Sequence, residues 1–463
     1  MHKASCLALV CCTALGFGAA RVDAATIHVA PGEVVVAAGN GRCSLREAIN
    51  NANAGGDTSG GDCVPGGAGS DDIILATGST YTLLDFADSS VQFGLSGLPA
   101  ITSTIDIKGN AATILRSATL FSGNDRCDST VSDSFRLFFV DTNGVLTLEN
   151  VRLHNGCASF EDFTGAGGAI FNRGSVTLME STVSANTARQ SGGAIHNDGT
   201  LELIQTTLRD NLVIDGAGGG IVNTGMFTAK QSTISGNTTP GAGGAMYNPG
   251  NTTMGNCTVS GNQADGTGGG LENDGAATLT NLTITANRAT SSAAADANPD
   301  PSLGGGIFND DDHTVTLANT IVAKQTRGTD CFGTIASNGH NLDSDGTCTT
   351  LVTDITSSTP DLGPLANNGG PTKTHALLPG SPAIDHGDNT ICAVDPVNNV
   401  DQRSVPRPLN GGTSLTCDIG AFELCLDCRA SSAPAASAPT LVGLACLLVV
   451  VAARRLRRLG EQG

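Results

Sequence analysis

Short stretches of alternating apolar and polar residues recur along the middle of the chain at a nearly constant interval. Successive residues of a β-strand point to opposite faces, so each stretch places two or three residues on one inward face. Each interval contains about three such stretches, separated by glycine, asparagine and other turn-forming residues. The pattern therefore predicts three short strands and three turns in each repeat.

One signal in the repeat is a glycine pair followed by an aliphatic residue and an asparagine. It reads GGAIFN (residues 167–172), GGAIHN (192–197), GGGIVN (218–223), GGAMYN (243–248), GGGLEN (268–273) and GGGIFN (304–309). The asparagines are separated by 25, 26, 25, 25 and 36 residues. A fixed period of this length indicates a solenoid, in which each repeat buries its apolar face against its neighbours. The longer last interval predicts an insertion, and we expect residues 291–301 to loop out.

A second signal runs in register with the first. In it an aliphatic residue stands three positions before an asparagine, and these asparagines are separated by 25, 26, 25 and 25 residues. We expect the aliphatic residues of both signals to form two inward stacks. The first stack contains Ile170, Ile195, Ile221, Met246, Leu271 and Ile307, and the second contains Val183, Leu208, Ile234, Val259 and Ile284.

Composition excludes a helical solenoid, because every repeat carries glycines that each cost roughly 1 kcal/mol inside a helix. A repeat of this length fits one coil of a parallel β-helix, and crossovers between parallel strands are nearly always right-handed. The expected fold class is therefore all-β, a right-handed parallel β-helix. Asparagine tolerates turn conformations, and its amide can bond to the same amide one coil away. The asparagines expected to do so are Asn172, Asn197, Asn223, Asn248 and Asn273.

One segment near the N-terminus has helical periodicity instead. It begins CSLREA at residues 43–48, in which Ser44 and Glu47 form a capping box. A solenoid needs its open end covered, so we expect this helix to cap the β-helix. The apolar face of the helix is formed by Leu45, Ala48, Ile49 and Ala52.

Both ends of the chain carry segments typical of export. Residues 1–24 combine Lys3, an apolar stretch and a small-residue cleavage motif, so we expect a signal peptide removed after Ala24. The apolar residues 439–453 precede four arginines, which indicates a short membrane segment with its end in the cytoplasm. The protein is therefore expected in the envelope, at the cell surface or secreted. The tail is either a permanent anchor or a sorting segment that a membrane protease removes.

The charge of the chain excludes several partners. The full chain has 24 basic and 43 acidic residues, for a net charge of −19. Removing residues 1–24 and 439–463 takes away six basic and two acidic residues, which leaves 18 and 41 and a net charge near −23. Such a surface argues against nucleic acid and anionic lipid as partners. It is compatible with calcium, but the acids form no repeated ligand pattern, so no cofactor is expected.

Eleven of the 15 cysteines lie between the two terminal segments, and an exported protein can oxidise them. Cys257 has no neighbour in sequence to pair with, and we expect it to be buried; Cys425 and Cys428 are close enough to pair with each other. The order of the cysteines does not fix their connectivity. The local pairs we expect are Cys43–Cys63, Cys127–Cys157, Cys331–Cys348 and Cys392–Cys417, each contributing about 3 kcal/mol.

These motifs resemble those of known bacterial exported proteins. The CSLREA string resembles the N-terminal motif of that name in exported β-helix proteins, and the GGA(I)/N repeats resemble those of the polymorphic outer-membrane protein family, which includes adhesins. Residues 362–370, 380–385, 401–403 and 418–423 resemble a choice-of-anchor domain, which precedes sorting tails. The resemblance implies an N-terminal cap (25–100), a β-helix (101–350), a choice-of-anchor-like domain (351–424), a linker (425–438) and a sorting or anchor tail (439–463).

The residue before each repeat asparagine faces outward by alternation. This outward row is Phe171, His196, Val222, Tyr247, Glu272 and Phe308. It contains no stacked pair of carboxylates of the kind that a glycosidase uses. Its aromatic and polar members are candidates for contact with a sugar ligand, although single exposed apolar residues are common on protein surfaces. The candidate ligand-binding residues are Phe171, His196, Tyr247, Glu272 and Phe308.

The densest acidic cluster is Asp310, Asp311 and Asp312, at the turn after the last GGGIFN signal. A solvated turn is the favoured interpretation of this cluster; the alternative is a metal site, which calcium would suit. Four further polar residues in the C-terminal domain, Asp385, Arg403, Asp418 and Glu423, are expected to form a buried structural network.

No convergent set of catalytic residues occurs in the repeats. The sequence therefore favours a non-catalytic surface or envelope protein that serves in adhesion or as a scaffold, with an extracellular glycan or protein as its ligand. The alternative is a carbohydrate-active enzyme, either a polysaccharide lyase or a glycoside hydrolase, because parallel β-helices also carry such enzymes.

Overall fold

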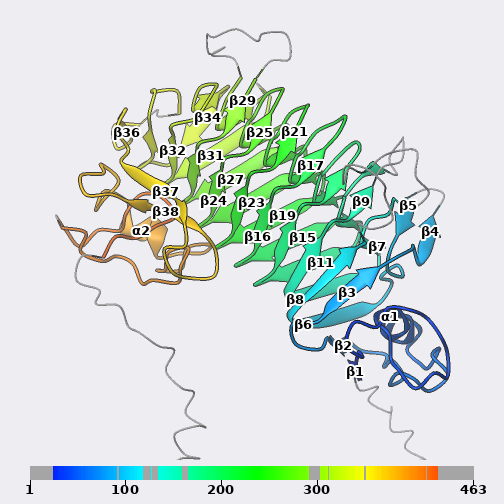
Figure 1. Ribbon diagram of the computed structural model, residues 1–463. Helices are drawn as coiled ribbons and strands as arrows, with labels where there is room; N and C mark the ends of the chain where they lie inside the picture. The colour runs from blue at the N-terminus through cyan, green and yellow to red at the C-terminus, as the bar shows by residue number, and fades with distance from the viewer. Residues whose placement is uncertain are drawn as a thin grey trace, which may run out of the picture. The chain divides into compact units, whose positions relative to one another are not determined.

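The computed structural model describes residues 24–90, 93–117, 127, 134–158, 165–290, 303–310, 312–348, 351–412 and 414–425. The expected signal peptide, the loop at 291–301 and the tail at 439–463 lie outside these residues, as does Asp311. The described chain up to Leu424 belongs to one structural unit. Its coils follow one another in chain order, and neighbouring strands belong to successive coils (Figure 1).

Parallel strands of successive coils form three sheets, which is the right-handed parallel β-helix that the sequence predicts. The largest sheet contains two lines of strands. Its first line is β1 (Thr26–His28), β2 (Asp71–Ile74), β6 (Thr104–Arg116), β8 (Val145–His154), β11 (Ser175–Met179), β15 (Thr200–Ile204), β19 (Met226–Lys230), β23 (Asn251–Gly255), β27 (Ala276–Thr280), β31 (Thr314–Ala318) and β34 (Ile335–Ser337). Its second line is β3 (Thr80–Leu83), the later halves of β6 and β8, β12 (Thr182–Ser184), β16 (Thr207–Arg209), β20 (Thr233–Ser235), β24 (Thr258–Ser260), β28 (Thr283–Thr285), β32 (Ile321–Ala323), β35 (Leu342–Asp343) and β36 (Ile355–Thr356).

The other two parallel sheets are built from shorter strands. The eight-stranded sheet contains β7 (Phe138–Val140), β10 (Ile170–Asn172), β14 (Ile195–Asn197), β18 (Ile221–Asn223), β22 (Met246–Asn248), β26 (Leu271–Asn273), β30 (Ile307–Asn309) and β33 (Cys331–Phe332). The six-stranded sheet contains β9 (Cys157–Ala158), β13 (Thr187–Ala188), β17 (Leu212–Val213), β21 (Thr238–Thr239), β25 (Gln263–Ala264) and β29 (Arg288–Ala289).

A regular coil contains four short strands, one more than the alternating pattern predicts. The coil from Ile195 to Val213, for example, consists of β14, β15, β16 and β17. The extra division falls at Gln205, whose φ of 49° is in the left-handed region and turns the chain between β15 and β16. Gln231 and Asn256 have the same conformation one and two coils later. Side-chain amides and small polar residues tolerate this region better than branched residues do.

Both predicted aliphatic stacks lie inside the β-helix. The strand register pairs Ile170 with Ile195 and Val183 with Leu208, and the same pairing continues coil after coil. Every member of the two stacks is at most 5 % exposed. Burial of side chains of this size contributes about 1.5–3 kcal/mol each, so the interior is a continuous apolar column.

The glycine pairs allow the coils to approach closely. Gly192 has a φ of +61°, and a Cβ atom there would lie 2.2 Å from the carbonyl oxygen of Ile195. Gly193 has an ordinary φ, but a Cβ atom on it would lie 2.2 Å from the carbonyl oxygen of Gly219 in the next coil. The first glycine of the pair therefore makes the turn, and the second permits contact between coils.

The asparagines of the first signal form a continuous internal ladder. The side-chain Nδ2 of Asn172 donates to Oδ1 of Asn197 at 2.7 Å, and the chain of bonds continues through Asn223, Asn248 and Asn273 to Asn309 at 2.7–2.8 Å. All six side chains have zero exposure. The ladder predicted from the spacing is therefore present.

The asparagines of the second signal form another buried ladder. It links Asn186, Asn211, Asn237, Asn262 and Asn287 through side-chain bonds of 2.8–3.0 Å. Each Oδ1 also accepts from the backbone N–H of the preceding asparagine in the ladder, as in the bond from Asn211 to Asn237 at 3.0 Å. These side chains therefore satisfy backbone groups that the turn would otherwise leave buried without a partner.

The segment that begins CSLREA forms helix α1 (Leu45–Ala54). The Ser44 side chain accepts from the Glu47 backbone, the Glu47 carboxylate accepts from the Ser44 backbone at 3.0 Å, and Gly55 ends the helix at a φ of 58°. The apolar face of α1 is buried in the same cluster as the first strands of the β-helix. The predicted capping box and the predicted cap are both confirmed.

Four disulfide bonds join the cysteine pairs expected from local spacing, Cys43–Cys63, Cys127–Cys157, Cys331–Cys348 and Cys392–Cys417. Cys257 is a buried free thiol, as expected. Disulfides are typical of proteins that fold in an oxidising compartment, which supports export. No helix among the described residues is both long and apolar enough to cross a membrane.

Residues after the last coil fold back along the largest sheet. They form the antiparallel pair β37 (Leu362–Ala366) and β38 (Thr374–Leu377) and the short helix α2 (Asn389–Cys392). A second antiparallel pair, β4 (Asp88–Ser90) and β5 (Gly94–Ser96), lies near the other end (Figure 1). We call β37, β38 and their connecting residues 367–373 the C-terminal hairpin.

The predicted polar network stabilises this C-terminal region. Asp418 accepts from the Asp385 backbone at 2.7 Å, and Glu423 accepts from the Asp418 backbone at 2.9 Å. Arg403 pairs with Asp401 at 2.6 Å and donates to the Glu423 carbonyl at 2.6 Å. The carboxylates are satisfied mainly by backbone N–H groups, so these residues have a structural role.

The first asparagine ladder predicts a large loss of stability from one substitution. Asn223→Ala removes two buried ladder bonds, the one from the Asn197 amide and the one to Oδ1 of Asn248, and each such bond contributes about 0.5–1.5 kcal/mol. We expect Tm in calorimetry to fall by several degrees. Asn251→Ala is the matched control, because Asn251 is exposed on the adjacent coil, and it should leave Tm within about a degree of the wild type. Equal Tm values for the two variants would contradict a stabilising role for the ladder.

Candidate binding groove

The outward row of the eight-stranded sheet forms as predicted. The register pairs Phe171 with His196, Tyr247 with Glu272, and Glu272 with Phe308. However, Phe171 and Glu272 are only 4 % and 6 % exposed, so this row is not an open binding surface along its whole length.

Aromatic stacking explains the burial of Phe171. Its ring lies 5.9 Å from that of Phe139 on the preceding coil and 4.9 Å from that of His196 on the next. Phe93, next to the β4–β5 pair, covers both phenylalanine rings at 5.7 and 5.1 Å. Phe308 stacks on Phe332 at 5.0 Å and stays partly exposed. The candidate residues Phe171 and His196 therefore lie in one stack and Phe308 in another.

The polar members of the row form a separate cluster. The Tyr247 hydroxyl donates to Asp274 at 2.6 Å, and Glu272 lies beside Tyr247 in the ladder. Burial, together with the nearby charges of Asp274 and Asp310, raises the pKa of Glu272 to about 8, although a hydrogen bond from Thr267 acts in the opposite direction. Within the described residues, the Oε2 atom of Glu272 has no hydrogen-bond partner. Glu272 is therefore a protonated carboxyl group at neutral pH.

The structure brings Asp310 near Glu272 but does not test the predicted metal site fully, because Asp311 lies outside the described residues. Asp312 is an exposed turn residue. No group of three or more His, Cys, Asp or Glu side chains within the described ranges is arranged to hold a metal ion. Calcium binding at Asp310, Asp311 and Asp312 stays a prediction.

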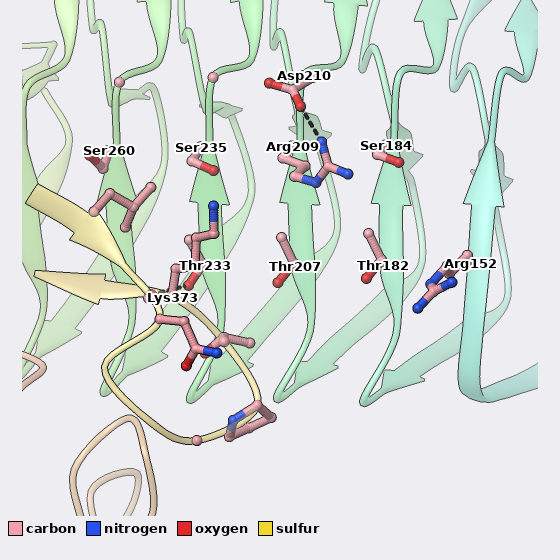
Figure 2. A pocket seen from close by; sticks show the side chains of 17 residues that line it. Arg152, Thr182, Ser184, Thr207, Arg209, Asp210, Thr233, Ser235, Ser260 and Lys373 are labelled. Carbon is pink, nitrogen blue, oxygen red and sulfur yellow. Dashed lines mark hydrogen bonds and ion pairs between the residues drawn. The ribbon is translucent and has the colours of Figure 1, made fainter. Parts of the chain in front are cut away.

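A groove lies on another face of the β-helix. It is not predicted from the sequence. The groove has a volume of about 1000 Å³ and lies over the outer surface of the second line of strands, from β8 to β24 (Figure 2). Two rows of outward side chains form its floor, one on each side of the inward aliphatic stack. The Thr row is Thr182, Thr207 and Thr233, continued from Arg152, and the Ser/Arg row is Ser184, Arg209, Ser235 and Ser260.

The C-terminal hairpin supplies the wall of the groove. Leu365, Asn367 and residues 370–373 line it, and Lys373 stands over the strands near Thr233 (Figure 2). The backbone carbonyl of Lys373 accepts from the Thr233 hydroxyl at 2.7 Å. The groove therefore depends on contact between two parts of the chain about 140 residues apart.

Basic side chains outnumber acidic ones in the lining of the groove. Arg209 pairs with the adjacent Asp210, which is the only acidic side chain that lines it. Arg152 and Lys373 are exposed and form no ion pair with any residue the structure describes. A local excess of positive charge therefore occurs on a chain whose net charge is −19.

One signal in the sequence points to the groove. Each inward aliphatic residue of the second signal is preceded by threonine and followed by serine, arginine or threonine, as in TVS (residues 182–184), TLR (207–209) and TIS (233–235). The repeated hydroxyl residues mark an outward face. No repeated sequence signal predicts the position of Lys373, because the C-terminal hairpin is not part of the repeat.

The comparisons with known proteins show no family for this chain. No protein-family model matches the sequence, and no curated protein matches it. Among solved structures, the chain is similar to the crystal structure of pectate lyase Pel9A, with a TM-score of 0.44 and 15 % identity over 87 % of this chain and 97 % of that chain. The likeness concerns the fold alone, and the resemblance to CSLREA, polymorphic outer-membrane and choice-of-anchor proteins stays a prediction.

The buried carboxyl group of Glu272 predicts a pH-dependent stability. Its folded pKa of about 8 lies above its ordinary value of 4.5, so the folded state holds a proton that the unfolded state releases between these values. The stability of the wild type should therefore fall as pH rises from 4.5 through 8 and stay low above 8. Glu272→Gln cannot ionise, and we expect it to be more stable than the wild type above pH 8, by several kcal/mol and at most about 5 kcal/mol.

Unfolding measured at both ends of this pH range tests the prediction. Below pH 4.5 the wild type and Glu272→Gln should be equally stable, because both side chains are then neutral. Glu180→Gln, at an exposed position, is the control and should show no such pH-dependent difference. A constant difference between Glu272→Gln and the wild type at all pH values would show that Glu272 is not a buried neutral acid.

Proposed function

We propose that this protein is an exported, non-catalytic surface or envelope protein that binds an acidic glycan in the groove, in an adhesion or scaffold role. The single observation that carries the proposal is the groove's composition. Arg152 and Lys373 are cations that pair with no acidic side chain among the described residues, and they lie among hydroxyl side chains on a strongly acidic protein. A site of this kind attracts an anion that the remaining surface repels.

The repeated floor of the groove favours a polymer over a small anion. Neighbouring parallel strands lie about 4.8 Å apart, so the five strands from β8 to β24 span about 20 Å. Hydroxyl groups recur at this interval in both outward rows. An extended chain of sugars presents hydroxyl groups at a comparable interval, so each coil can contact one sugar unit in the same way.

The lining also supports a role in binding without catalysis. Hydrolysis of a glycosidic bond usually needs two carboxyl groups on either side of the bond. The groove offers one, Asp210, and Arg209 neutralises it. The hydroxyls of Thr182, Thr207 and Ser235 on the floor are partly exposed and suit hydrogen bonding to a ligand. Those of Thr233 and Ser260 are buried against the C-terminal region and close the groove at that end.

Export is supported by the disulfide bonds and by the resemblance of the CSLREA segment to exported proteins. In this proposal, residues 1–24 direct secretion. Residues 439–463 hold the chain at the membrane until a processing protease removes them, or permanently if no cleavage occurs. The net charge of −19 argues against nucleic acid as a ligand.

A carbohydrate-active enzyme is the second candidate, and one observation favours it. Glu272 holds a proton at neutral pH beside the carboxylate of Asp274, which resembles the division into acid and base that glycosidases use. Incubation with acidic and neutral polysaccharides would test it through release of reducing ends or unsaturated products. Release that is lost in both Glu272→Gln and Asp274→Asn would favour this enzyme over the binding protein.

The binding proposal predicts a loss of affinity when either unpaired cation is removed. Arg152→Gln and Lys373→Gln should each weaken binding of alginate oligomers about tenfold, or about 1.4 kcal/mol, measured by calorimetry. The affinity of the wild type should also fall with added salt, because the contacts are exposed. Arg288→Gln is the matched control, since Arg288 is exposed on β29, outside the groove, and it should bind as the wild type does.

The proposed ligand class, acidic glycans, is tested with alginate, polygalacturonate and hyaluronate. Neutral cello-oligosaccharides serve for comparison. Binding of a neutral oligomer as tightly as the acidic ones would contradict the role of the two cations. Absence of binding to every acidic polymer in the panel would overturn the proposed function.

A further inference from the structure

The floor of the groove continues beyond the groove itself. The Thr row passes from Thr233 to Thr258 and Thr283, and the Ser/Arg row passes from Ser260 to Thr285. A second hollow, of about 380 Å³, lies on these later coils and is lined by Thr285, Lys324 and residues 359–364. One sheet face therefore carries two separate hollows.

The C-terminal hairpin separates the two hollows. His375 on β38 lines the second hollow, and its Nε2 lies 2.8 Å from the hydroxyl of Ser260, which lines the first. The His375 Nδ1 atom bonds to the Gly363 carbonyl on β37 at 2.7 Å, so both strands of the hairpin are fixed at this point. His375 is 7 % and Ser260 3 % exposed, which leaves no open path between the hollows here.

Further buried contacts hold the hairpin against the sheet. The side-chain Nε2 of Gln402 donates to the Thr233 and Thr372 hydroxyls at 2.8 and 2.9 Å, and its Oε1 accepts from the Thr258 hydroxyl at 2.6 Å. The Thr372 hydroxyl donates to the Gln231 carbonyl at 2.9 Å. Gln402 has zero exposure. Because these groups satisfy one another, lifting the hairpin would leave several buried polar groups without partners.

We propose that the groove recognises the end of an acidic glycan chain and not an internal stretch. The inference rests on the proposed function and adds the form of the ligand. A chain that enters along the coils from the side of Arg152 meets the hairpin at Thr233 and Ser260 and cannot pass (Figure 2). The terminal sugar then lies at the closed end, where Lys373 is the nearest unpaired cation and pairs with its carboxylate.

Stoichiometry on long polymers tests this proposal directly. Alginate and polygalacturonate fractions of increasing defined length are mixed with excess full-length protein, and bound protein per polymer chain is measured by sedimentation velocity. One end of a linear polymer presents one site, so the ratio should stay constant at one protein per chain for all lengths. Affinity should rise with length only until the five strands of the groove are filled.

Two lysine variants provide a matched pair. Lys373 lies on the near side of the hairpin and Lys324 lies on the far side, over the same sheet face. Lys373→Gln should weaken binding of long polymers about tenfold, and Lys324→Gln should change it by less than about twofold. Lys324 is exposed, so the Lys324→Gln variant is expected to fold. Circular dichroism checks the folding of both variants.

The outcomes separate the two proposals. A ratio of protein to polymer that grows with length, or an equal loss in Lys324→Gln, would overturn recognition of the chain end and leave binding in the groove intact. Failure of every uronic-acid polymer to bind would overturn the proposed function and this inference together. A constant ratio with a loss confined to Lys373→Gln supports the chain-end site.

Discussion

The amide-to-amide hydrogen bond between asparagines of successive coils sets the register on which the molecule depends. Two such ladders run through the β-helix, from Asn172 to Asn309 and from Asn186 to Asn287. Each side chain is fully buried, so a shift of one coil by a single residue would leave amide groups unsatisfied in an apolar interior. The aliphatic stacks alone would tolerate such sliding better, because apolar contacts are not directional. The ladders therefore fix which residues of neighbouring coils stand side by side.

A fixed register also decides what the outer surface can do. Once Val183 and Leu208 stack inside, the residues on either side of them must stack outside, so Thr182 lies beside Thr207 and Ser184 beside Arg209. A polar face with a regular interval follows from the packing of the core. The specific chemistry then comes from departures from the repeat. Arg152 replaces a threonine at one end of the Thr row, and Arg209 replaces a serine in the middle of the other row.

Contacts that recur from coil to coil can be predicted from the sequence, whereas contacts with segments outside the repeats cannot. The stacks and the first ladder follow from spacing, because each coil repeats the same contacts. The cap follows from local helical periodicity, and the four disulfides join cysteines that lie close in sequence. The turn at Gln205 is not predicted, because the sequences of β15 and β16 together look like one alternating stretch. The burial of Phe171 depends on Phe93, which lies far away in the sequence and outside the repeats. For the same reason the candidate row of Phe171, His196, Tyr247, Glu272 and Phe308 is divided between two aromatic stacks and an acidic cluster, and Lys373 is absent from every motif.

A departure in the Thr row explains why the C-terminal region lies where it does. The row that reads Thr182, Thr207, Thr233, Thr258 and Thr283 continues as Ile321 and Leu342. Outward isoleucine and leucine would be exposed on a bare sheet, and here they pack with Leu377, Ile384, Ile419 and Phe422 from the C-terminal region. Apolar burial thus anchors this region on the last coils, while hydroxyl and amide contacts at Thr233 and Thr258 hold its hairpin on the earlier ones. Because apolar contact is confined to the last coils, the hairpin extends no farther along the Thr row than Thr233 on β20, and the outward residues of β8, β12 and β16 stay open to a ligand.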